Sequence, residues 1–177
     1  MSSSTVVVAI EIHGMTTPTS ETFKGYFTFI YGRIFPLFLL TLLACSKRTQ
    51  DGTIASNFAN TGSSTENMYM AFDDDIQTLW YYSGLPAHID YTFNEGRTEW
   101  INAYELTAGW QWRERMPRKW KVYGINGDQQ VLLDYRANYY FPNRRYTQRF
   151  YMKTNTQRFN KYRFEIGICF SFIYYSQ

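Results

Sequence analysis

The sequence contains few of the residues on which common active sites depend: 2 Cys, 2 His and 5 Pro in 177 residues. Two cysteines cannot build a disulfide framework or a cysteine-based zinc cluster. Two histidines give little support for a histidine-rich metal site or for a nucleophile activated by histidine. We therefore do not expect an enzyme.

Aromatic residues, in contrast, are abundant: 16 Tyr, 14 Phe and 5 Trp make up 20% of the chain, within a 45% hydrophobic share. Aromatic side chains favour β-strands over helices. The length corresponds to about one domain with an ordinary core. The composition thus favours a folded, strand-rich protein.

Charge is unevenly distributed, although the net charge is only +3. Residues 97–163 contain 14 basic and 5 acidic residues, an excess of 14 − 5 = +9, whereas residues 65–95 contain six acidic residues and no Lys or Arg. Such polarity could steer an anionic partner to one face. The simpler interpretation, which we favour, is that Arg and Lys alternate on the solvent side of strands.

The N-terminal part has a different character. We expect no core from residues 1–20, which are rich in Ser and Thr. An 11-residue apolar run, Ile34–Ala44, follows Arg33. It is too short for a membrane-spanning helix of about 20 residues but suits the apolar region of a signal peptide, with cleavage after Ala44.

The end of this run, Leu42-Leu43-Ala44-Cys45, resembles the lipobox of bacterial lipoproteins. That resemblance implies lipidation of Cys45 and an extracellular or cell-surface location. Residues 1–32 precede the basic residue, which is a long lead for a signal peptide. Three interpretations stay open: a signal with a misassigned start codon, a signal-anchor, and translated non-coding sequence.

After a polar linker at residues 46–52, the chain shows short alternating segments separated by turns. In residues 88–93, for example, Ile89, Tyr91 and Phe93 share one face, and Asn126-Gly127 is a typical hairpin turn. Similar segments occupy residues 100–106, 120–124, 131–135, 149–152 and 162–166. With no helical pattern between them, they predict an all-β fold, an antiparallel β-sandwich of the jelly-roll type.

Two motifs within this region resemble the discoidin, or coagulation-factor type C, family. The first ends in Ala71-Phe-Asp-Asp-Asp-Ile-Gln-Thr-Leu-Trp80, and the second is Arg115-Met-Pro-Arg-Lys-Trp-Lys-Val-Tyr-Gly124. The resemblance covers about residues 53–166 and implies the galactose-binding-like jelly roll, which bacterial carbohydrate-binding modules share. The sequence departs from the family in three places: Asp74 replaces the usual Gly, Met116 replaces the acidic residue before Pro117, and the tail, residues 167–177, does not resemble the family's closing strand. We therefore expect the domain to be truncated at its C-terminal end.

The acidic turn within the first motif is a candidate metal site. The resemblance implies a structural calcium ion held by Asp73, Asp75 and Thr78. Calcium binds carboxylate, carbonyl and hydroxyl oxygens, so the donor types are suitable. The family's last ligand is a C-terminal Glu, for which residues 166–177 offer no match. The alternative is a turn whose Asp side chains accept hydrogen bonds from nearby backbone amides.

The candidate ligand-binding residues lie in an aromatic loop between two predicted strands. An exposed indole can stack on a sugar ring while Arg donates hydrogen bonds to its hydroxyls. The loop supplies Trp110, Trp112, Arg113 and Arg115. The alternative is that one Trp closes the end of the sandwich. Weaker candidates are Tyr81, Tyr82, Tyr139, Phe141 and Asn143, whereas we expect Trp80, Trp100 and Trp120 in the core and a structural role for His88.

These observations together predict a non-catalytic binding module that recognises carbohydrate, as a glycan or glycoconjugate, at a cell surface or in extracellular matrix. The alternative is an adhesion domain that binds a protein or an anionic phospholipid surface through Trp110 and Trp112 beside their arginines. Nucleic-acid binding by the basic half is a third class, which we do not expect.

Overall fold

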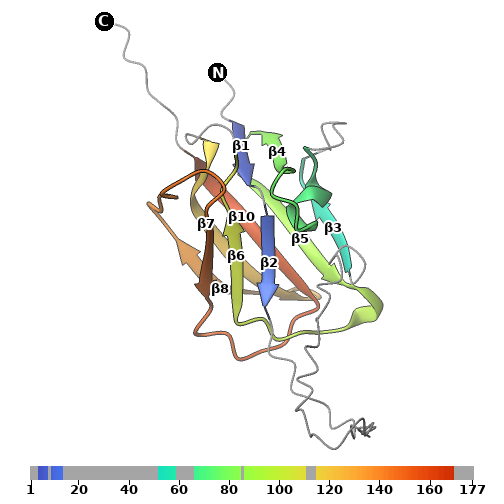
Figure 1. Cartoon of the computed structure of the whole chain (residues 1–177). Helices are drawn as coiled ribbons and strands as arrows, with labels where there is room; N and C mark the ends of the chain where they lie inside the picture. The colour runs from blue at the N-terminus through green and yellow to red at the C-terminus, as the bar shows by residue number, and fades with distance from the viewer. Residues whose placement is uncertain are drawn as a thin grey trace, which may run out of the picture.

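The computed structural model describes residues 4–7, 9–13, 52–58, 66–84, 86–110 and 115–169. These ranges are almost entirely β-structure, with short 3-10 helices at Met68–Phe72 (η2) and Asn94–Gly96 (η3). The strands are β1 (Ser4–Val7), β2 (Ala9–His13), β3 (Gly52–Ser56), β4 (Trp80–Ser83), β5 (Ala87–Phe93), β6 (Ala103–Thr107), β7 (Pro117–Asn126), β8 (Gln129–Arg136), β9 (Thr147–Tyr151) and β10 (Lys161–Cys169) (Figure 1).

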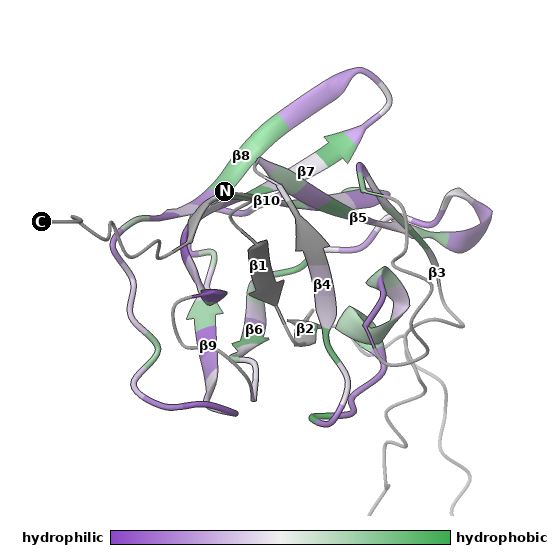
Figure 2. Cartoon of the chain, turned by 90° about the horizontal axis from the view of Figure 1, so that it is seen from above, coloured by the Kyte–Doolittle hydropathy of each residue, from purple (hydrophilic) through white to green (hydrophobic). Residues whose placement is uncertain are grey.

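The strands form two layers, which Figure 2 shows from above. One layer is a five-stranded sheet in the order β3-β5-β10-β7-β8, and the other is a three-stranded sheet in the order β2-β6-β9. β1 pairs with β4. Every pair of these strands is antiparallel, so the predicted all-β antiparallel sandwich is confirmed.

The core lies between the layers and follows from strand alternation. In β5, Ile89, Tyr91 and Phe93 face inward, as their spacing predicts. Aromatic rings fill much of this space in edge-to-face pairs, such as Tyr91 on Phe93. Trp80 and Trp120 are fully buried, which confirms their predicted place in the core.

The N-terminal strands are the main departure from the sequence-based expectation. β2 pairs with β6, β1 pairs with β4, and Ile10 is 1% exposed within the core cluster. The expectation of no core in residues 1–20 is therefore wrong. The short Val and Ile run falls in two strands, β1 and β2, whose partners lie far along the chain, where local composition cannot indicate them.

The apolar run 34–44 and Cys45 lie outside the described residues, as do residues 170–177. Within the described ranges, no helix is both long enough and apolar enough to cross a membrane. The first residues of the atypical tail, Gly167 to Cys169, continue β10, which pairs with β7 through register shifts after Ile166. The predicted hairpin turn joins β7 to β8, where Gly127 has a φ of 55°.

Candidate functional site

The acidic turn leads into β4 and has the local geometry that its sequence indicates. Asp74 has a φ of 60°, the left-handed conformation that Asp adopts more readily than most residues. This bend lets the backbone amide of Asp75 donate to Asp73 Oδ1 at 3.0 Å. The amide of Gln77 donates to Asp75 Oδ1 at 2.8 Å. The turn is therefore closed by its own carboxylates.

The three predicted calcium ligands converge within this turn. Thr78 Oγ1 lies 3.0 and 2.8 Å from the two carboxylate oxygens of Asp73 and 2.9 Å from the carbonyl oxygen of Asp75. One hydroxyl proton can satisfy only one of these acceptors. Two of the acceptors also receive a backbone N–H: Asp73 Oδ1 from Asp75 and the Asp75 carbonyl from Thr78. The oxygens that converge here are of the types that calcium binds. Among the described residues, no cluster of three or more His, Cys, Asp or Glu could hold a metal, so a site here needs hydroxyl and carbonyl donors.

The aromatic loop follows β6 and is described at its two ends. Trp110 is 39% exposed. Arg115 places its guanidinium carbon 5.9 Å from the ring centroid of Tyr81 on β4, a cation–π distance. The structure thus brings together two candidate residues that are distant in sequence. Trp112 and Arg113 lie outside the described residues, as does the side chain of Tyr82.

A third segment, residues 142–146, connects the turn with the loop. The guanidinium of Arg145 donates to Gln77 Oε1 at 3.0 Å, and its backbone amide donates to the carbonyl of Ala108 at 3.0 Å. The amide of Ala108 in turn donates to the carbonyl of Tyr146 at 2.9 Å. The acidic turn, the aromatic loop and this segment therefore occupy the same end of the sandwich.

Two of the weaker candidates pack in or against the core. Phe141 is buried, and Tyr139 packs edge-on against Trp120 with ring centroids 5.5 Å apart. The burial of Phe141 contradicts its prediction as a ligand residue, whereas Tyr139 is only partly buried and its role stays a prediction. Tyr140, between them, is exposed and stacks with Arg118 at 3.9 Å. Trp100 is half-buried, and its indole donates to the carbonyl of Asn155 at 2.8 Å.

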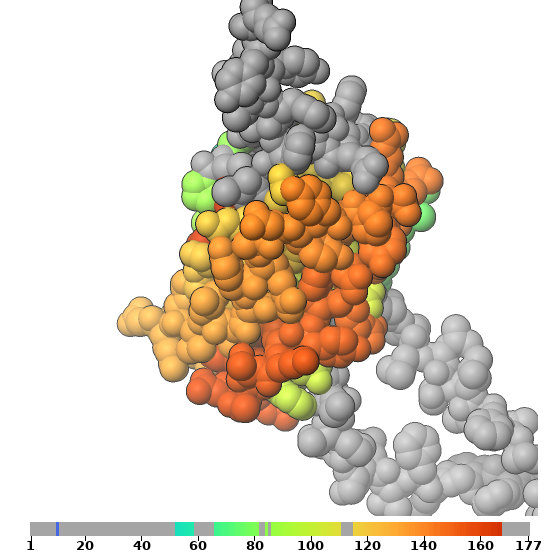
Figure 3. Space-filling view, turned by 90° about the vertical axis from the view of Figure 1, so that its left-hand side faces the viewer, coloured from blue at the N-terminus to red at the C-terminus, as the bar shows by residue number. Residues whose placement is uncertain are grey.

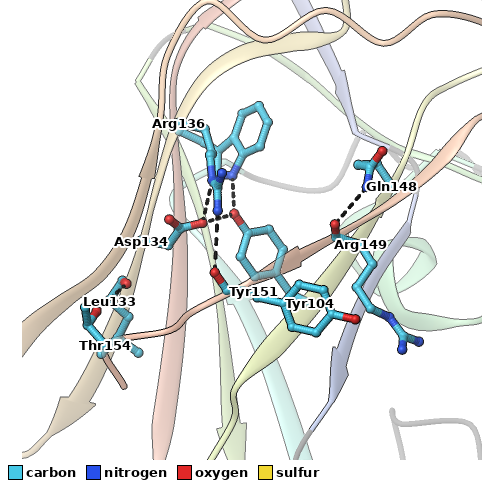
Figure 4. Close-up of polar contacts among 9 residues, drawn as sticks. Tyr104, Leu133, Asp134, Arg136, Gln148, Arg149, Tyr151 and Thr154 are labelled. Atoms are coloured by element: carbon cyan, nitrogen blue, oxygen red, sulfur yellow. Dashed lines mark hydrogen bonds and ion pairs between the residues drawn. The ribbon is translucent and has the colours of Figure 1, made fainter. Parts of the chain in front are cut away.

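Sequence reasoning missed a polar network that joins the two sheets (Figure 4). The Tyr104 hydroxyl on β6 donates to Asp134 Oδ2 on β8 at 2.6 Å and accepts from Trp120 Nε1 on β7 at 2.8 Å. Arg136 pairs with the same carboxylate oxygen at 2.9 Å. Burial, with help from the Asp134 carboxylate, raises the pKa of Tyr104 far above its ordinary value. Asp134 is the one charged residue in the run 131–135, and this was the feature of the sequence that could have indicated a buried polar contact.

Three further tyrosines have exposed side chains. They are Tyr135 on β8, Tyr140 in the following loop and Tyr151 on β9, with relative exposures of 48%, 63% and 56%. The segments that carry them form the orange surface in Figure 3. Lys119 approaches the ring of Tyr135 at 5.9 Å. None of these tyrosines was predicted as a site residue.

The described strands define an antiparallel β-sandwich, and its fold can be compared with those of known proteins. No protein-family model and no curated protein matches the chain. Two solved structures are similar in fold. The family 32 carbohydrate-binding module of Clostridium perfringens NanJ, in complex with galactose, has a TM-score of 0.54 at 10% identity, covering 70% of this chain and 87% of that one. The module CpGH89CBM32-5 from Clostridium perfringens, in complex with GalNAc-β-1,3-galactose, has a TM-score of 0.55 at 11% identity, covering 70% and 88%.

At these identities the likeness concerns the fold alone. It confirms the galactose-binding-like sandwich that the two motifs predict. The narrower resemblance to the discoidin family stays a prediction.

Proposed function

We propose that this protein is a non-catalytic module that binds carbohydrate at the loop end of its sandwich. The observation that carries the proposal is the placement of Trp110 and the Arg115–Tyr81 pair at one end of a galactose-binding-like fold. An exposed indole offers a flat apolar surface to a sugar ring, and a guanidinium donates to its hydroxyls. The two fold neighbours were solved with galactose and with a GalNAc-galactose disaccharide, so galactose-type sugars are the first ligands to test.

The affinity per site should be modest, because sugar hydroxyls exchange hydrogen bonds with water for similar bonds with protein. Isothermal titration of the full chain with galactose, GalNAc and a wider glycan panel tests the proposal. Trp110→Ala should weaken binding at least tenfold. The matched control is Tyr151→Ala, since Tyr151 is 56% exposed but pairs with Ala103 at the opposite end of the three-stranded sheet.

Two results would contradict this proposal. If Tyr151→Ala abolished glycan binding and Trp110→Ala left it intact, the ligand would bind away from the loop end. Binding to vesicles of anionic phospholipid, with steep salt dependence and no response to any glycan, would favour the adhesion function instead.

We also propose that calcium binds the acidic turn as a structural ion. Asp73 would supply its carboxylate, Asp75 its carbonyl and Thr78 its hydroxyl, because the carboxylate and carbonyl oxygens already lie within 3.0 Å of the Thr78 hydroxyl. These groups provide fewer oxygens than the 6–8 that calcium prefers, so other carbonyls or waters would complete the shell. Bound calcium would fix the turn that leads into β4 and hence the position of Tyr81.

A further inference from the structure

β2 occupies an unexpected place in the sheet. It precedes β3 in the chain, yet it lies at the edge of the other layer, beside β6 (Figures 1 and 2). The pairing runs from Ala9 opposite Thr107 to His13 opposite Ala103. β2 is therefore a strand added to the sandwich from a distant part of the sequence.

The added strand covers an edge that the sandwich would otherwise leave open. β6 is buried along almost its whole length, with Tyr104 and Leu106 inside the core. β9 pairs with its other side. Without β2, the backbone N–H and C=O groups on the free side of β6 would lose their partners, and Ile10 would leave a gap in the core.

β1 attaches the same segment at a second place. It pairs with β4, from Ser4 opposite Ser83 to Val7 opposite Trp80. Trp80 is fully buried, so this pairing also lies over the core. The N-terminal segment is thus held by backbone pairing to two strands, β4 and β6, which are not neighbours in the chain.

The sequence between this segment and β3 is long. Residues 14–51, that is 51 − 13 = 38 positions, separate His13 from Gly52, and they include the predicted cleavage position between Ala44 and Cys45. The entropic cost of closing a connection grows only slowly with its length, so a long connection does not prevent this pairing.

We propose that the edges of β4 and β6 form a strand-acceptor site whose occupant is this chain's own segment, residues 4–13. The register and the buried Ile10 give this occupant its specificity. The segment stays bound as a separable peptide when the chain is cut between Ala44 and Cys45.

The test inserts a recognition sequence for a site-specific protease between Ala44 and Cys45 of the full chain. After the cut, gel filtration with mass spectrometry should show residues 1–44 co-eluting with residues 45–177, and the unfolding midpoint should change little. Separation of the two pieces, with the larger piece keeping its original midpoint, would overturn the proposal.

Variants at Ile10 separate strand pairing from nonspecific adhesion of the apolar run 34–44, which all of them retain. Ile10→Asp should weaken retention of the cut peptide at least tenfold, whereas Ile10→Val should retain it. Equal retention of both variants would overturn the proposal, because the apolar run alone would then explain it.

Two further measurements cover the remaining outcomes. If Ile10→Asp fails to fold before cutting, a synthetic peptide of residues 4–13 should displace the cut wild-type segment, while a scrambled peptide should not. Light scattering of the uncut protein should give a monomer. A dimer that separates on cutting would mean that a second copy supplies the strand, which overturns the intrachain occupant.

Discussion

The Tyr104 hydroxyl donates a 2.6 Å hydrogen bond to the Asp134 carboxylate and so joins the three-stranded sheet to the five-stranded sheet. The same hydroxyl accepts from the Trp120 indole, so its donor and acceptor roles are both used inside the core. A fully satisfied polar bridge between apolar layers fixes how the layers align. This alignment also sets the loop end of the sandwich, because β6 and β7 flank the aromatic loop.

Removing the bridging hydroxyl should destabilise the fold. Tyr104→Phe leaves the Trp120 indole and one side of the Asp134 carboxylate without their partner, at a cost of about 1–3 kcal/mol. Urea unfolding measures this loss. Tyr151→Phe, at an exposed position, is the control and should change little; equal stability of the two variants would show that water replaces the hydroxyl.

Loss of the ion pair between Asp90 and Arg163 should cost more stability than loss of a more exposed ion pair. These residues are directly opposite on β5 and β10, and the guanidinium contacts both carboxylate oxygens at 2.7 Å. Asp90 is only 6% exposed. Arg163→Gln leaves a nearly buried carboxylate unpaired and should cost about 3 kcal/mol in urea unfolding.

The matched control for this pair is Arg149→Gln. Arg149 pairs with Glu105 across β9 and β6, and both partners are more exposed than Arg163 and Asp90: the side chains are 45% and 20% exposed, against 27% and 8%. We expect little change in stability, because solvent screens exposed ion pairs. A larger loss for Arg149→Gln than for Arg163→Gln would contradict the role of burial.

Stability should fall as the pH drops through the titration of His88. Burial lowers its pKa below the ordinary 6.5, Arg163 lowers it further, and Asp90 and Glu165 oppose the shift. The unfolded chain therefore takes up this proton at a higher pH than the folded chain. The contribution of neutral His88 to the free energy of unfolding is therefore fully present above pH 6.5, and it is lost as the pH falls through the folded-state pKa of His88.

His88→Gln removes this titration. Urea unfolding of the variant should show a smaller loss of stability than the wild type between about pH 7 and pH 5. At pH 7.5 the two proteins should differ only by a pH-independent offset. An unchanged slope in His88→Gln would assign the acid sensitivity to other groups.

Calcium should raise the unfolding temperature through the acidic turn. A ligand that binds only the folded state stabilises it by about 2.7 kcal/mol at a hundredfold excess over its Kd. Thermal unfolding with calcium and with EDTA should therefore differ, and Asp73→Asn should remove the difference. Asp128→Asn, in the exposed turn between β7 and β8, is the control. An equal midpoint with calcium and with EDTA would mean that the turn is closed by its own hydrogen bonds alone.

The sequence by itself determined the local elements. Alternation placed Ile89, Tyr91 and Phe93 on the core face of one strand, and Asn126-Gly127 marked the hairpin between β7 and β8. The left-handed Asp74 was also foreseeable from its position in a motif that usually has Gly there. Each of these features depends on residues within a few positions of one another. Their steric preferences and their spacing can therefore be read from the sequence directly.

Tertiary structure alone decided which distant residues meet. Nothing near Ala9–His13 indicates β6 as its partner, nothing near Phe141 shows that its loop folds into the core, and nothing near Tyr104 indicates Asp134. Antiparallel strands accept many partners with similar backbone hydrogen bonding. Which strands pair is decided by the total free energy of burying complementary side chains from the whole chain. No local sequence pattern contains that total.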